Sequence, residues 1–156
     1  MRRALSVLAG FAILNSACFN EPVTPPDRSR LDARLLGEWD CRPPDASSED
    51  RALLTVFRFD AGQYYAEWKE GEKLERYRAY PGGLRGLAIL NVAELSDKYW
   101  TALRASFSAD GSMSLAMPAT RIIDVKDDAV RLRTFRHEAN QSTAWQGFAL
   151  CVPHKG

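Results

Sequence analysis

Apolar and polar side chains alternate along much of this chain, and this period of two limits the fold more than any other feature. In residues 63–70, Tyr64, Ala66 and Trp68 fall on one face, which is typical of a half-buried β-strand. The pattern therefore predicts an all-β protein. The alternating side chains of the other segments are Leu53, Thr55, Phe57 and Phe59; Tyr99, Thr101, Leu103, Ala105 and Phe107; Met113, Leu115 and Met117; Val130, Leu132 and Thr134; and Phe148, Leu150 and Val152.

Short glycine-containing segments separate several of these strands, at residues 60–62, 70–72, 81–83 and 110–111. Glycine allows the positive backbone dihedrals of tight reversals, so the strands are expected to follow one another as an antiparallel meander. An open sheet of about eight or nine strands would leave edges that can pair with other chains. We therefore expect one small antiparallel β-barrel, with a β-sandwich as the alternative.

Three polar segments of the sequence each predict a local structure. Residues 47–53 predict one short helix, because two serines can cap it and two acidic residues follow. Asp124, Asp127 and Asp128 lack the spacing of a calcium loop and predict a charged turn between strands. His137 has no partner nucleophile or metal-ligand motif and is expected at an exposed hairpin end.

The chain contains three cysteines, Cys18, Cys41 and Cys151. If Cys18 is modified, the other two can form a disulfide with no cysteine left over, as an oxidising compartment permits. This bond would join the first expected strand to the last, which favours closure of the barrel. A redox or metal role for the pair has no supporting motif in the sequence.

The first eighteen residues have the layout of a bacterial export signal. Two arginines and an apolar run over residues 4–14 are followed by Ser16, Ala17 and Cys18. The run is too short for a membrane span, which needs roughly twenty apolar residues. The segment resembles the signal of a bacterial lipoprotein, in which the cysteine becomes the acylated first residue.

The lipoprotein resemblance implies a signal peptide over residues 1–17 and a palmitate-type lipid anchor on Cys18 at the periplasmic face of the outer membrane. Asn15 stands where the family has Leu, Val or Ile. Cleavage after Ala17 without acylation, giving a soluble periplasmic or secreted protein, and an uncleaved anchor are the alternatives. Residues 18–34 are proline-rich and are expected to form a flexible tether, followed by the barrel domain over residues 35–156.

A second resemblance comes from residues 35–39, Leu-Leu-Gly-Glu-Trp, at the head of the first expected strand. A Gly-x-Trp sequence that opens a meander resembles the start of a lipocalin. The resemblance implies a barrel that holds small hydrophobic molecules, with Trp39 packed across its closed end. In that family an arginine near the last strands covers the tryptophan, and Arg131, Arg133 and Arg136 are the candidates here.

Aromatic and arginine side chains supply a candidate ligand site. Rings would provide apolar contact, and arginines would meet a carboxylate or phosphate. Ordinary packing within the sheet is the alternative, because strands favour aromatic residues. The candidates are Trp39, Tyr64, Trp68, Arg76, Arg78 and Tyr80, with Tyr65 and Tyr77 in the same stretch.

Charge and motifs limit the remaining function classes. The formal net charge is +1, which provides no electrostatic attraction for nucleic acid. The sequence contains no nucleophile elbow, no zinc-protease motif and no phosphate-binding glycine loop. We therefore expect a non-catalytic protein without cofactor or metal. It would be a small-molecule carrier or, alternatively, a protein-binding lipoprotein such as an envelope assembly accessory or an inhibitor of an extracellular enzyme, with an unrecognised hydrolase as a third possibility.

Overall fold

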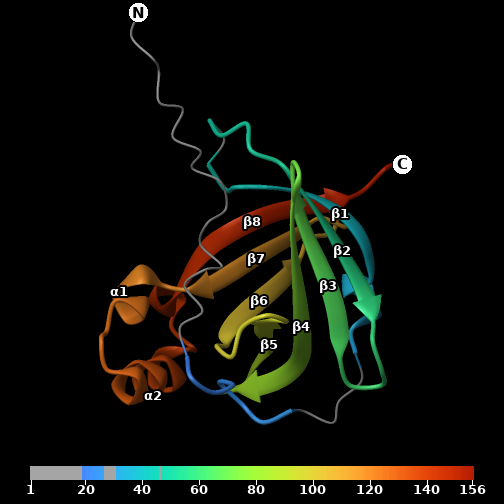
Figure 1. Cartoon of the computed structure of the whole chain (residues 1–156). Helices are drawn as coiled ribbons and strands as arrows, with labels where there is room; N and C mark the ends of the chain where they lie inside the picture. The colour runs from blue at the N-terminus through green and yellow to red at the C-terminus, as the bar shows by residue number, and fades with distance from the viewer. Residues whose placement is uncertain (1–18, 27–30, 46) are drawn as a thin grey trace, which may run out of the picture.

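A computed structural model describes residues 19–26, 31–45 and 47–156 of the chain. Its strands form one closed antiparallel barrel in which each strand pairs with the next in sequence (Figure 1). The predicted all-β meander barrel is confirmed, and the sandwich alternative is wrong. The strands are β1 (Gly37–Arg42), β2 (Ala52–Arg58), β3 (Tyr64–Glu70), β4 (Lys73–Leu84), β5 (Leu87–Glu94), β6 (Thr101–Phe107), β7 (Met113–Pro118) and β8 (Trp145–Pro153).

The barrel closes where β1 pairs with β8. The register between these strands places Cys41 directly opposite Cys151, and the two cysteines form a disulfide. The predicted pairing is therefore confirmed. Because these strands are the first and last of the barrel, the bond holds together the two ends of the sheet.

The inward faces of β3, β6 and β7 agree with the sequence prediction. Tyr64 and Trp68 of β3 and Leu115 of β7 are buried in the core inside the barrel. In β2 the expected face is reversed, because Leu54 and Val56 point inward while Phe57 is 47% exposed. The sequence of β2 is apolar at both parities, so alternation alone does not determine which face is buried.

The segment 130–134, predicted to be a strand, is part of helix α2 (Asp128–Glu138). The carboxylate of Asp127 caps this helix by accepting a hydrogen bond from the backbone N–H of Val130 at 2.8 Å. Leu132 and Phe135 are buried because residues three apart share a face of a helix. Leu132 fits both the period of two of a strand and the period of a helix, so alternation alone did not decide between them. Asp127, which caps the helix, was the signal in the sequence that favours a helix.

The other local predictions also differ from the structure. Residues 47–51 form no helix, and the carboxylate of Asp45 accepts from the backbone N–H of Ser47 in a turn instead. Asp124 and Asp127 lie between two helices, α1 (Thr120–Ile123) and α2, and Asp128 is the first residue of α2, so the three do not form a turn between strands. His137 lies in the last turn of α2. Short 3-10 helices complete the fold, η2 (Ala33–Leu35) and η3 (Ser142–Ala144).

Residues 19–26, here called the strap, pack on the outside of the barrel beside α2 (Figure 1). Phe19 is fully buried, exchanges two backbone hydrogen bonds with Trp100 at 3.0 and 2.9 Å, and packs its ring against Phe135. The sequence predicted a flexible tether over residues 18–34. The described residues of that stretch contact the barrel instead, because Phe19 and Val23 pack on its outside and Leu31 joins its interior core.

A buried polar network fixes the strap to β4 and β5. Asn91 is fully buried, and its side-chain amide accepts from the backbone N–H of Thr24 at 3.1 Å and donates to the Thr24 hydroxyl at 3.0 Å. The Tyr80 hydroxyl donates to the Thr24 carbonyl at 3.2 Å. Arg136 of α2 donates to the Val23 carbonyl at 2.8 Å. Each of these groups would carry an unmet hydrogen bond if the strap left.

Replacement of Gly82 by alanine should disrupt this network. A Cβ at Gly82 would lie 1.9 Å from the Thr24 hydroxyl and 2.9 Å from the Asn91 amide nitrogen, so the strap must move. We expect Gly82→Ala to lower the free energy of unfolding by about 1–3 kcal/mol in urea titrations. Gly83→Ala is the matched control, since a Cβ there meets nothing within 4 Å. Equal stability of the two variants would contradict the expected clash.

Candidate interior binding site

An apolar cavity of about 70 Å³ lies inside the barrel. Side chains from seven of the strands and from the 3-10 helix η2 surround it, and all of them belong to apolar or aromatic residues. Such a lining disfavours water, because a water molecule needs two or more polar partners. The lining residues are Leu35, Leu54, Val56, Tyr64, Ala66, Trp68, Tyr77, Ala79, Leu90, Val92, Leu103, Met113, Leu115 and Phe148.

The polar atoms of the aromatic lining residues are already bonded within the protein. The Trp68 indole N–H donates to the Glu70 carboxylate at 2.7 Å. The Tyr77 hydroxyl donates to the Glu75 carboxylate at 2.6 Å. Burial and this carboxylate raise the pKa of Tyr77, so its hydroxyl keeps its proton. The aromatic side chains therefore present ring carbon to the cavity.

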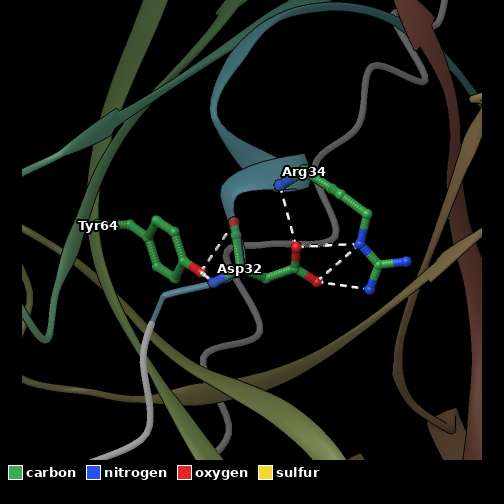
Figure 2. Close-up of polar contacts among 3 residues, drawn as sticks. All are labelled: Asp32, Arg34 and Tyr64. Atoms are coloured by element: carbon green, nitrogen blue, oxygen red, sulfur yellow. Dashed lines mark hydrogen bonds and ion pairs between the residues drawn. The ribbon is translucent and has the colours of Figure 1, made fainter.

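One mouth of the barrel is closed by residues 31–36, here called the plug. Leu35 of the plug lines the cavity, and its carbonyl accepts from the Trp39 indole N–H at 3.1 Å. Figure 2 shows how Tyr64 holds the start of the plug: its hydroxyl accepts from the Asp32 backbone N–H at 2.7 Å and donates to the Asp32 carbonyl at 3.3 Å. The plug is therefore attached to β3 and β1 through hydrogen bonds to its backbone.

An ion pair orders the outer side of the plug (Figure 2). The Arg34 guanidinium bonds the Asp32 carboxylate, with Nη2 and Oδ2 at 2.7 Å, and these hydrogen bonds lower the pKa of Asp32. Arg34 also stacks 4.5 Å from the Phe107 ring centroid. An exposed pair of this kind contributes little stability.

The structure divides the predicted site residues between two sides of the barrel wall. Tyr64 and Trp68 line the cavity, and Trp39 belongs to the same interior core. Arg76 and Arg78 are exposed on the outer face of β4, where Arg76 pairs with Glu67 at 3.5 Å and Arg78 stacks on Trp100 at 4.6 Å. Tyr80 is buried outside the barrel beneath the strap. The arginines and the interior rings thus do not share one site.

The three arginines named as candidates to cover Trp39 do not lie over it. Arg131, Arg133 and Arg136 lie on α2, which packs against the outside of the barrel, whereas Trp39 is in the interior core. The Trp39 ring lies 6.2 Å from the Phe107 ring, measured between centroids. The proposed site left out most of the residues that line the cavity. Among them, Met113, Leu115 and Phe148 stand at alternating positions of the expected strands, and this alternation was the sequence signal that could have found them.

Removal of the Tyr64 hydroxyl should loosen the plug. In Tyr64→Phe the Asp32 N–H loses its partner, and we expect a loss of about 1–2 kcal/mol in unfolding free energy with faster amide exchange at Asp32. Tyr65→Phe is the control, because the Tyr65 hydroxyl bonds Glu67 away from the plug. Hydrogen exchange by NMR measures the effect. Unchanged exchange at Asp32 would contradict the role given to Tyr64.

Cys18 and the expected signal peptide lie outside the described residues. Among residues 19–26, 31–45 and 47–156, no group of three or more histidine, cysteine, aspartate or glutamate side chains is arranged to hold a metal ion. The helices in this part of the chain are all too short or too polar to cross a membrane. No protein-family model, curated protein or solved structure matches the chain.

Proposed function

We propose that this chain is an exported envelope lipoprotein, anchored through Cys18 at the periplasmic face of the outer membrane, whose barrel binds a small hydrophobic ligand. The single observation that supports ligand binding is the apolar cavity enclosed by the barrel. Transfer of apolar surface from water into such a site contributes about 25 cal/mol per Å². A cavity lined only by apolar and aromatic side chains favours a hydrophobic ligand over water.

Export and anchoring are proposed from the order of residues at the N-terminus. An apolar run, small residues and Cys18 follow the initial arginines. The Cys41–Cys151 disulfide supports the same proposal, because such bonds persist in oxidising compartments such as the periplasm.

Native mass spectrometry of the full-length chain expressed in a Gram-negative host, and extracted in mild detergent, tests both parts. We expect a mature mass that begins at Cys18, carries acyl groups, gains two hydrogens on reduction of the disulfide, and includes a small-molecule adduct. The Cys18→Ala variant is the control and should carry no acyl group. An unmodified chain, or one that still begins at Met1, would rule out the anchor. Absence of any adduct, together with failure to bind added hydrophobic probes, would rule out the ligand.

A protein-binding lipoprotein is the second candidate, favoured by exposed rings on the outer face of the barrel. Phe57 and Phe59 are 47% and 71% exposed, and the Phe57 ring lies 5.8 Å from that of Tyr65, centroid to centroid. Exposed rings of this kind suit contact with another protein. A stoichiometric protein adduct in the same spectra, lost on Phe57→Ser and Phe59→Ser, would favour this function over ligand transport.

A further inference from the structure

We propose that the interior site takes a compact, neutral ligand without hydrogen-bonding groups, of the size of one hydrocarbon ring or a short alkyl chain, and that it rejects carboxylates. This inference rests on the proposed function and narrows it. It departs from the sequence-based expectation that arginines would meet a carboxylate or phosphate beside the aromatic rings.

The side chains of the cavity wall offer a ligand no hydrogen-bond donor that is not already bonded within the protein. A ligand carboxylate or carbonyl needs an N–H or O–H group, and the lining residues supply only three such side-chain groups, those of Tyr64, Trp68 and Tyr77. Each of the three already donates to an oxygen of the protein. A polar ligand group would therefore be buried without a partner, at a cost of several kcal/mol for a charge.

The charged side chains around the same rings also disfavour an anionic ligand. Glu75 and Glu70 accept the hydrogen bonds of Tyr77 and Trp68 and, being two residues from them on β4 and β3, lie on the same inward face toward the turn between these strands. Lys73 is the cation paired with Glu75, at 2.6 Å. Arg78 is on the outside of β4, stacked on Trp100. Two carboxylates and one ammonium at this end of the cavity leave a net negative charge, which disfavours an anionic ligand there.

The volume of the cavity also limits which ligands fit. The cavity has a volume of about 70 Å³, several times the roughly 10–15 Å³ that one water molecule requires. This volume suits a single hydrocarbon ring or a short alkyl chain. Leu35 of the plug forms part of the wall, so a ligand that extends toward this mouth would have to displace the plug and break the hydrogen bonds between Tyr64 and Asp32. The small volume and the plug at this mouth therefore favour compact molecules.

Methionine methyl groups provide a direct measurement of binding. Met113 lines the cavity, whereas Met117 is buried in the same core but does not line it. The full chain, labelled with ¹³C at its methionine methyl groups, is titrated with toluene, with benzoate and with laurate while the NMR signals of both residues are followed. Toluene and benzoate present the same ring and differ in the carboxylate, and laurate represents a long anionic ligand.

We expect toluene to shift the Met113 signal saturably and benzoate to bind at least about a hundredfold more weakly. Ala79→Leu, which adds a larger side chain to the cavity wall, should abolish the toluene shift, while Ala61→Leu in the exposed loop between β2 and β3 should preserve it. The wild-type comparison of toluene with benzoate stands even if Ala79→Leu fails to fold.

Two other results would overturn the proposal in different ways. Binding of benzoate or laurate as tight as that of toluene would refute the neutral ligand class and leave the proposed carrier function intact. Failure of all three probes to shift Met113 would refute both the ligand class and the carrier function.

Discussion

Replacement of both Cys41 and Cys151 by serine is expected to lower the free energy of unfolding by about 4–5 kcal/mol, the largest effect of any change considered. The bond closes a loop of 110 residues, and in the chain-entropy model long loops gain most from a crosslink. Urea titration of the wild-type and variant proteins measures the difference. Replacing both cysteines together avoids a free thiol that could form intermolecular bonds.

Reduction of the wild-type protein is the control for the serine variant. If the crosslink itself stabilises the barrel, the reduced protein and the variant should unfold at the same urea concentration. We also expect the amides of β1 and β8 to exchange faster than in the oxidised wild type in both, because the missing crosslink lies within their pairing, where Cys41 is opposite Cys151. A loss below about 1 kcal/mol would mean that strand pairing alone holds this junction.

The barrel could be predicted because its strands repeat one local rule. Tyr64, Ala66 and Trp68 alternate with polar residues, and the predicted glycine turns follow β2, β3 and β6, so these hairpins are encoded by adjacent residues. The turn predicted at residues 81–83 is wrong, because these residues belong to β4 and the chain reverses at residues 85–86. The cysteines added the one long-range constraint that local patterns lack. The helix α2 was missed because Val130, Leu132 and Thr134 also fit a period of two.

The candidate site was only partly predictable from sequence. Ring side chains such as Tyr64 and Trp68 stand out by type, but the side of the wall on which Arg76, Arg78 and Tyr80 lie depends on strand register. A shift of one residue moves a side chain from the interior to the outside. The strap was not predictable either, because its proline-rich composition resembles a linker while Phe19 and Val23 are anchored by residues distant in sequence.

The Phe135→Ala variant tests whether the strap and α2 form one cooperative unit with the barrel. Phe135 is fully buried between Phe19 of the strap and Trp145 of β8, with ring centroids at 5.5 and 5.1 Å. Removal of such a ring leaves a cavity and costs about 3–5 kcal/mol of unfolding free energy. Urea titration measures this loss, and Val130→Ala on the exposed side of α2 is the control, expected to cost less than about 1 kcal/mol.

Limited proteolysis of the Phe135→Ala variant shows which part of the chain becomes accessible when the ring is lost. Loss of the Phe135 ring should expose Phe19, so cleavage within residues 19–26 should become faster while the barrel, held by its own interior core and the disulfide, stays resistant. Equal protection of the strap in wild type and Phe135→Ala would mean that the Thr24 and Asn91 hydrogen bonds hold it independently of the helix. A strap bound through Phe135 instead makes α2 the element that fixes residues 19–26 against the barrel.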